Sequence, residues 1–401
     1  MKVDVAVVGG GIVGGAAALA LDRAMPGRVV HVAPATRPDG RTTALLNPSI
    51  ALLDKIGVWK GVRHAAAALK TMRLLDGTKR LLRARPLDFA ASEVAEAQFG
   101  YNIPNDVLLA ELARVPGPQR VDAEVVAARP IGNGWELRLA GGGAIEADAL
   151  VGADGRHSMC REAAGIGIRR WSYPQVALVT TFAHENPHEG VSVEFHTETG
   201  PFTQVPLPPE PGTPHRSSLV WVVPPEDAEA IRERSRAAIA TKVAERLEYM
   251  FGDVTLEDDL SAFPLVGMAA DSCGARRVLL VGEAAHVFPP IGAQGANLGF
   301  RDVADCVDAL ARHTDADAAA RAYARSRLAD VTLRTAAVDA LNRSLLTGFL
   351  PAQAARAFGA TVLGRSASLR RGLMKAGLGV SSGKDRPAAH PSSSGTAHPS
   401  R

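Results

Sequence analysis

Hydrophobic residues near the amino end of the chain form short unbroken stretches. Residues 3–8 and 28–33 are rich in valine, a pattern typical of strands buried on both faces of a parallel sheet. Residues 16–24, which lie between them, have the alanine- and leucine-rich composition of a helix. The order of strand, turn, helix and strand predicts the first unit of a nucleotide-binding α/β domain.

The same pattern returns later in the chain, on either side of a region of different character. We expect helices at 105–114 and 297–310, and strands at 121–127, 135–139, 149–152 and 277–281. From about residue 168 to 261, valines and aromatic residues alternate between Pro- and Gly-rich turns, which predicts an antiparallel sheet. Within that region, residues 232–251 have the spacing of one amphipathic helix.

Together the patterns predict an α/β fold in which a Rossmann-like domain is interrupted by a β-rich domain. The end of the chain is rich in Ser, Pro, Gly and His, a composition that cannot build a core. We assign 1–70, 96–167 and 262–345 to the discontinuous Rossmann-like domain, 71–95 and 168–261 to an antiparallel β-rich substrate domain, 346–379 to a C-terminal helical region and 380–401 to a disordered tail.

Composition narrows the classes of function. Of the 401 residues, 46% are hydrophobic and 22% are charged, as in ordinary soluble enzymes. A net charge of +3 without any run of Lys or Arg argues against nucleic acid as a partner. Three widely spaced cysteines and the lack of a signal-peptide pattern predict a cytoplasmic protein.

The first candidate site is the glycine-rich turn after the first strand. Gly9 permits a tight turn, Gly11 lets the backbone approach a pyrophosphate, and Gly14 allows close packing of helix on strand. The phosphates would lie at the positive end of the helix that starts near Ile12.

One residue expected of such a site is missing. An Asp or Glu about 20 residues farther on, at the end of the second strand, normally holds the ribose hydroxyls of a dinucleotide. The chain has Ala33 there and no acid nearby. Three arrangements stay open: His31 substitutes, a later group does, or backbone and water hold the ribose.

Two more motifs follow strands farther along the chain. Asp154 and Gly155 come directly after a predicted buried strand, at the sheet edge where ligands of open α/β sheets bind. A longer motif begins with Glu283 after another strand, passes through a loop and leads into a helix near residue 296. Its other candidate residues are Pro290, Gly292, Gly295, Ala296 and Asn297. The backbone N–H groups of the last two could point at an anionic ring oxygen.

In this order, the three motifs resemble those of the aromatic-hydroxylase group of FAD monooxygenases, the group A flavoproteins that include para-hydroxybenzoate hydroxylase. The likeness covers most of residues 1–345, and Glu283 stands where the group has Asp. Segments 41–45, 171–175, 184–188 and 200–201 are similar to the branch that hydroxylates ubiquinone precursors.

The resemblance implies a role for further residues and a chemistry. Arg41 would contact the ribityl and pyrophosphate region of FAD, Asn105 would be a polar cofactor contact, and Asp154 would lie near the pyrophosphate and the nicotinamide entry. Non-covalent FAD would be reduced by NADH or NADPH and would react with O₂ to give a flavin C4a-hydroperoxide, which attacks an electron-rich ring. No catalytic base is assigned, and His286, His184 and His188 stay undecided.

The implied substrate is a lipophilic phenol or quinone precursor with a polyprenyl tail. Residues 345–375 combine large apolar side chains with Arg and Lys. This region is either a helix docked on the core or a basic amphipathic surface held at the inner face of the cell membrane or in a membrane-associated biosynthetic complex. The alternatives for the whole protein are a hydroxylase of a soluble aromatic compound, a flavin reductase of isoprenoid chains, and a flavin-binding scaffold without catalysis.

Overall fold

The structure is a computed structural model that describes residues 1–35, 40–78, 83–289, 294–346, 358–359 and 361–378. It has the α/β fold of the para-hydroxybenzoate hydroxylase type, with a Rossmann sheet, a second sheet that is mostly antiparallel, and helices at the carboxyl end. The fold class expected from the sequence is confirmed. The predicted disordered tail lies outside the described residues.

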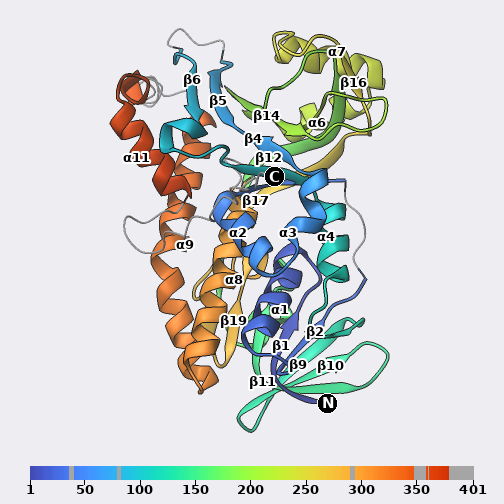
Figure 1. Ribbon diagram of the computed structural model, residues 1–401, viewed down its shortest axis with the longest axis vertical. Helices are drawn as coiled ribbons and strands as arrows, with labels where there is room; N and C mark the ends of the chain where they lie inside the picture. The colour runs from blue at the N-terminus through green and yellow to red at the C-terminus, as the bar shows by residue number, and fades with distance from the viewer. Residues whose placement is uncertain (36–39, 79–82, 290–293, 347–357, 360, 379–401) are drawn as a thin grey trace, which may run out of the picture.

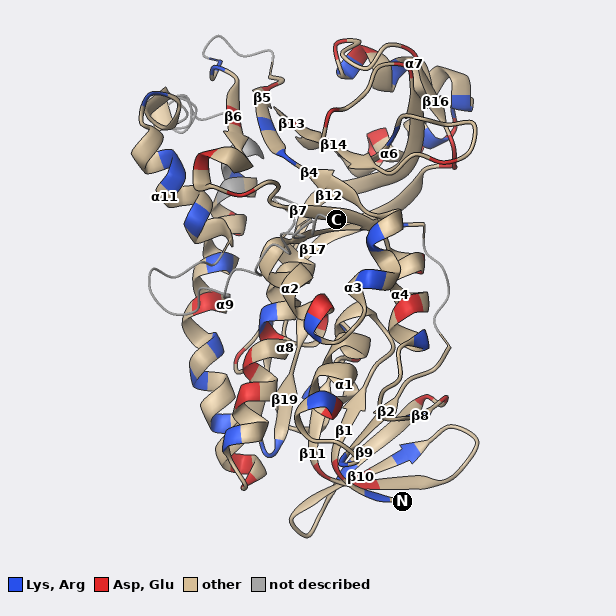
Figure 2. Ribbon diagram, viewed as in Figure 1, with Lys and Arg blue, Asp and Glu red and all other residues tan. Residues whose placement is uncertain are grey.

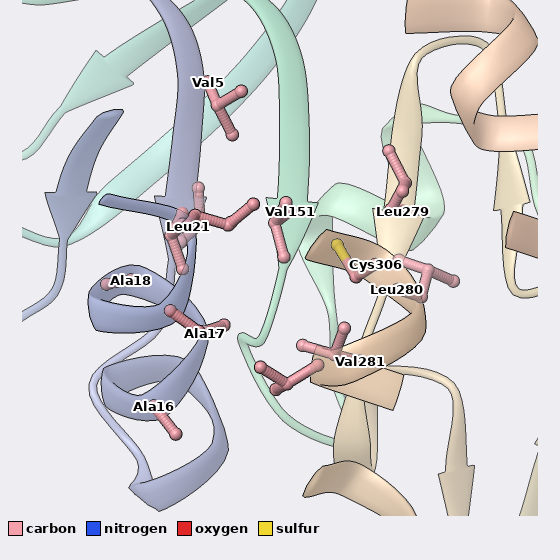
Figure 3. Close-up of a cluster of buried hydrophobic side chains, with 14 of the residues drawn as sticks. Val5, Ala16, Ala17, Ala18, Leu21, Val151, Leu279, Leu280, Val281 and Cys306 are labelled. Carbon is pink, nitrogen blue, oxygen red and sulfur yellow. The ribbon is translucent and has the colours of Figure 1, made fainter. Parts of the chain in front are cut away.

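The Rossmann sheet has eight strands, and its parallel centre is buried on both faces. Its main path is β18 (Gly274–Ala275), β19 (Val278–Leu280), β11 (Ala144–Gly152), β1 (Lys2–Val8), β2 (Val29–Val32) and β8 (Gln119–Val121). Strand β10 (Gly134–Leu139) pairs with β11, and β9 (Val125–Ile131) pairs with β10. Helices α1 (Ile12–Ala24) and α8 (Gln294–Arg312) pack together beside it. Figure 3 shows their core, in which Leu21, Val151, Leu280 and Cys306 come from four different elements.

The second sheet has nine strands and lies at the other end of the molecule (Figure 1). Its path is β20 (His286–Val287), β17 (Ser261–Ala270), β12 (Ile168–His184), β15 (Arg216–Val223), β14 (Gly200–Leu207), β13 (Val191–Thr197), β5 (Thr71–Asp76) and β6 (Leu87–Ala90), with β16 (Val254–Leu256) paired to β12. All these pairings are antiparallel except that of β13 with β5. The fully buried Phe182 and Trp221 anchor its core.

A small third sheet connects the two larger ones. It consists of β3 (Thr42–Leu46), β7 (Gly100–Pro104) and β4 (Ala67–Leu69). Strands β4 and β7 contact β14, whereas the adjoining helices α2 (Asn47–Lys55) and α4 (Asn105–Arg114) contact α8 and α1. A short helix, α3 (Trp59–Val62), packs between α2 and α4. The third sheet therefore fixes the position of the second sheet relative to the Rossmann sheet.

Helices of the carboxyl-terminal part run along one side of both sheets (Figure 1). Helix α9 (Ala316–Leu346) contacts β18 and β19 of the Rossmann sheet and β14 of the second sheet. Helix α11 (Ala367–Leu378) packs on the short helix η2 (Ala91–Val94). No helix of the described residues is long and apolar enough to cross a membrane.

The prediction of one continuous helix over 232–251 is wrong. The structure has two helices, α6 (Pro225–Arg232) and α7 (Arg236–Arg246), and a turn in which Glu248 and Tyr249 have positive φ. The break lies at Ser235, whose extended backbone begins α7 and whose hydroxyl accepts a hydrogen bond from the Ala238 N–H. A side chain that caps a helix start in this way satisfies a backbone donor that a continuous helix would have used internally.

Replacement of Ser235 by alanine should therefore lower the free energy of unfolding by about 1 kcal/mol, the usual cost of a lost N-cap. Ser235→Thr should retain most of the stability because threonine also caps. Urea denaturation of the two variants and the unmodified chain measures the difference. If Ser235→Ala is as stable as the unmodified chain, the capping bond does not stabilise this break.

Candidate functional site

The three motifs meet at the carboxyl ends of three neighbouring parallel strands, β1, β11 and β19. The Ala153 N–H donates to Val8 O (2.8 Å) and the Val281 N–H donates to Gly152 O (2.9 Å). The strand ends are therefore joined to one another just where each motif begins. In an open α/β sheet this edge is where ligands bind.

Two of the three glycines in the first motif are required by backbone packing. A Cβ atom on Gly9, whose φ is +125°, would lie 2.1 Å from Ala153 O. A Cβ atom on Gly14 would lie 2.2 Å from Gly9 O. Because these two positions lack side chains, the start of α1 packs closely on the glycine turn, and the turn packs closely on the second motif.

Gly11 is different, because a Cβ atom there would meet nothing within 4 Å in the part of the chain that the structure describes. Gly11 is exposed and forms the N-cap of α1, so its surroundings are open at the positive end of the helix. An open space at a helix start, bordered by glycine, fits the pyrophosphate of a dinucleotide. The residues present thus suit the cofactor that the motifs imply.

The third motif packs against the first through Val13. Cβ atoms on Gly282 and Gly299 would lie 3.2 Å and 2.7 Å from methyl carbons of Val13. Gly282 also has φ +60°, which favours glycine. As a result, the starts of α1 and α8 lie side by side at the edge of the Rossmann sheet.

Asp154 uses its carboxylate inside the second motif. Its two oxygens accept hydrogen bonds from the Ser158 hydroxyl (2.5 Å) and the Cys160 N–H (2.9 Å), at the entry of helix α5 (Met159–Ala163). Gly155 follows with φ +78°, and a Cβ atom there would meet none of the described residues within 4 Å. Asp154 therefore fixes the shape of the loop that borders Gly9.

Glu283 lies where the second and third motifs meet. Its side chain is 51% exposed, and its carboxylate is 3.7 Å from Nε of Arg156, which follows Gly155. This ion pair is weak at such exposure and distance. The carboxylate is accessible to a ligand at the sheet edge.

Asn297 joins the start of α8 to the third sheet. Its Oδ1 accepts hydrogen bonds from the Leu46 N–H (2.8 Å) and the Ser49 hydroxyl (2.7 Å), and its Nδ2 donates to Ala44 O (2.8 Å). The side chain is thus used for structure. Gly295 and Ala296 lie in the same first turn of α8, whereas Pro290 and Gly292 lie outside the described residues.

Arg41 and Asn105 are brought together beside the second sheet. The Asn105 N–H donates to Arg41 O (2.9 Å), and the Asn105 Oδ1 accepts from the Thr43 hydroxyl. The guanidinium of Arg41 lies 5.4 Å from the ring centroid of Phe263 on β17. These contacts place both predicted residues where the third sheet adjoins the second.

A buried polar cluster beneath the third motif contains His286, which the sequence left undecided, and two residues that the sequence did not single out. Asp302 of α8 is 2.6 Å from His286 Nε2, accepts the Gly282 N–H (2.9 Å) and receives Arg327 Nε of α9 (2.7 Å). The three side chains are 1%, 0% and 4% exposed for His286, Asp302 and Arg327. Asp302 and Arg327 are 25 residues apart on two helices, a separation that no local pattern connects.

Neither of the histidines of the β-rich region that the sequence left undecided presents an unused ring nitrogen. Both nitrogens of His184 are within hydrogen-bond distance of protein atoms, Asn186 O and Ser217 Oγ. His188 contacts Leu207 O and the Gly190 N–H in the same way. Burial lowers the pKa of both residues, so the rings are neutral near pH 7. These contacts give both histidines structural roles.

His31 supports the glycine turn. It is buried, and its Nε2 lies 2.9 Å from Gly9 O. Burial lowers the pKa of His31, so near pH 7 the neutral ring donates from Nε2 to that carbonyl. No group of three or more His, Cys, Asp or Glu suited to a metal occurs in the part of the chain that the structure describes.

Comparison with known proteins agrees with this geometry. A family model described as an FAD binding domain matches residues 2–333. Ubiquinone hydroxylase UbiL of Rhodospirillum rubrum is 34% identical over 400 residues, covering 94% of this chain and 90% of that protein. For 3-demethoxyubiquinol 3-hydroxylase of Escherichia coli the identity is 30%, with 94% and 98% covered.

A solved structure adds support for the fold. HpxO of Klebsiella pneumoniae, in complex with FAD and uric acid, aligns with a TM-score of 0.73 at 16% identity, covering 94% of this chain and 96% of that one. At this identity the likeness concerns the fold. Because the family model spans most of the chain and the motifs meet at one sheet edge, the protein belongs to the FAD-binding monooxygenases.

Proposed function

We propose that this FAD-dependent monooxygenase hydroxylates the aromatic ring of a polyprenylated ubiquinone precursor, with NADH or NADPH as reductant and O₂ as the source of oxygen. The observation that carries the substrate assignment is the 34% identity, over nearly the whole chain, to a protein named as a ubiquinone hydroxylase. The E. coli relative named for a ubiquinol precursor supports the same class.

The cofactor would be held without a covalent bond at the edge where the motifs meet. Gly11 and the start of α1 would receive the pyrophosphate, and Arg41 and Asn105 would contact the middle of the cofactor. Glu283 would hold the ribityl chain, and Asp154 with Gly155 would shape the loop beside it. Pro290 and Gly292, which belong to the same motif, keep their predicted role as neighbours of the flavin.

FAD supplies the redox chemistry when it is bound. The chain would contribute the backbone N–H groups of Ala296 and Asn297 in the first turn of α8, where donors and the helix dipole would stabilise negative charge on the flavin ring. Packing of the third sheet against α8 through Asn297 keeps those donors in place. We also propose that the domain boundaries expected from the sequence separate a cofactor-binding domain from a substrate domain.

Access to a membrane-dissolved substrate would be provided by α11. Met374 and Leu378 are buried against Leu87 and Phe89, so one face of the helix docks on the protein. Leu369 and Leu373, one turn apart, are 55% and 51% exposed. Lys and Arg residues lie on the same helix (Figure 2), including the exposed Arg371 and Lys375. Exposed leucines and cations on the same helix suit the surface of an anionic bilayer.

The substrate assignment is tested by deleting the gene and analysing quinone intermediates by mass spectrometry. We expect a polyprenylated precursor that lacks one ring hydroxyl to accumulate, and the unmodified gene to restore ubiquinone. A normal ubiquinone level in the deletion strain would reject the assignment. The soluble-aromatic hydroxylase would then be the better hypothesis.

Gly11→Val should abolish FAD binding while the chain still folds, because the added side chain enters only the space assigned to the pyrophosphate. Gly14→Val should also lower the thermal midpoint of the flavin-free protein, since its Cβ meets backbone at 2.2 Å. Flavin content and melting curves of both variants separate the two effects. Stoichiometric FAD in Gly11→Val would contradict the phosphate assignment.

Glu283→Ala should weaken FAD binding by about 1 kcal/mol, the low end of the cost of a lost hydrogen bond because the side chain is half exposed. Glu283→Asp should remain close to the unmodified protein. Flavin titration of the two variants gives the dissociation constants. Equal affinities for the alanine and aspartate variants would mean that the carboxylate does not reach the cofactor.

Both the leucines and the cations of α11 should strengthen its association with anionic lipid vesicles. We expect the double variant Leu369→Ser/Leu373→Ser to leave a salt-sensitive residual association, and Arg371→Gln/Lys375→Gln to weaken binding about tenfold or more at low salt, at ~1 kcal/mol per cation. Vesicle co-sedimentation measures both. Leu328→Ser, at a leucine of α9 that is 62% exposed, is the matched control, and an equal loss there would contradict the assignment to α11.

A further inference from the structure

The carboxyl end of β2 lacks the acid that dinucleotide-binding sheets use to hold the adenosine ribose. The residue there, Ala33, is fully buried and has no hydrogen-bonding side chain. His31 cannot replace the acid, because its Nε2 is bonded to Gly9 O in the turn. Among the described residues, an acid for this purpose comes from another element.

The neighbouring strand β8 ends beside β2 and is followed directly by an acid. The two strands are parallel with Val32 opposite Val121, and the Ala33 N–H donates to Val121 O (3.1 Å). Asp122 therefore directly follows Val121, the residue whose carbonyl accepts this hydrogen bond from Ala33. Its side chain is 73% exposed at this sheet edge.

The carboxylate of Asp122 forms an ion pair and lies near the residue that supports the turn. Arg120 Nε lies 2.6 Å from Asp122 Oδ1. Besides the dominant effect of burial, Arg120 lowers and Asp122 raises the pKa of His31, so both charges are within electrostatic range of the residue that supports Gly9. Among the described residues the other oxygen, Oδ2, has no hydrogen-bond partner in the structure, and a carboxylate can accept from several donors.

We infer that Asp122 replaces the missing acid of β2 and accepts hydrogen bonds from the ribose hydroxyls of the adenosine half of FAD. Neighbouring strands are about 4.8 Å apart, so the carboxylate is displaced by one strand from its usual place, toward the outer end of the dinucleotide. The inference rests on the FAD binding of the family and is independent of the substrate proposal.

The test compares FAD with FMN, which lacks the adenosine half. Flavin is removed reversibly from the full-length chain, and dissociation constants are measured by titration for the unmodified protein and for Asp122→Asn. We expect Asp122→Asn to weaken FAD binding about tenfold, which corresponds to ~1.4 kcal/mol, and to leave FMN binding within twofold. Unchanged FAD affinity, or an equal loss for FMN, would overturn the inference.

A rescue variant and a neighbouring control complete the experiment. Ala33→Glu restores an acid at the usual position, so it should recover most of the lost FAD affinity when combined with Asp122→Asn. Glu124→Gln removes an exposed carboxylate two residues farther on and should change neither affinity. If Glu124→Gln lost as much FAD affinity as Asp122→Asn, general surface charge would explain the effect, and the inference would be rejected. If the unmodified chain bound no flavin, FAD binding itself would fail instead.

Discussion

A buried carboxylate, Asp302, joins the elements on which the cofactor site is built. A fully buried charge destabilises the folded protein by several kcal/mol unless it is paired and fully hydrogen-bonded. Asp302 receives the Gly282 N–H at the start of the third motif, His286 of β20 and Arg327 of α9. Strand β20 belongs to the second sheet, whereas Gly282 follows the Rossmann strand β19. Loss of this carboxylate would therefore loosen the connection between the two sheets as well as the loop between them.

The glycines of the motifs fall into two physical kinds that the sequence pattern does not distinguish. Gly9 and Gly14 are needed because protein backbone lies about 2 Å from where their side chains would be. At Gly11, Gly155 and Gly295 no atom of the described residues outside the immediate chain lies within 4 Å of that position. The first kind shapes the protein, and the second leaves room beside the sheet edge, which is what a bound dinucleotide needs. Only the structure separates the glycines that packing requires from those beside open space.

Local pattern and motif order predicted most of the fold, because the buried strands and the helix α4 depend on the composition of their own segments. The prediction of one helix over 232–251 was wrong. The helical spacing of apolar residues continues across Ser235, where a serine cap starts a new helix. The parallel pairing of β5 with β13, the contact of Arg41 with Phe263 and the Asp302 cluster join residues far apart in the chain. Such contacts depend on how the sheets are placed relative to each other, which no periodicity within one segment records.

The segment 171–175, which resembles the quinone branch, has a structural role in this chain. Trp171 Nε1 donates to the Tyr173 hydroxyl, which donates to Asp339 of α9, both at 2.6 Å. Burial and the neighbouring Asp339 raise the pKa of Tyr173 to about 12, so the phenol keeps its proton and the bond persists throughout the neutral range. Next to it, Asn342 donates to Gln175 (3.0 Å). Gly267 leaves room for Trp171, since a Cβ atom there would lie 2.1 Å from the indole. These contacts hold α9 against β12, so the resemblance in this segment reflects how the helix is held on the sheet, and the substrate assignment must rest on the chain as a whole.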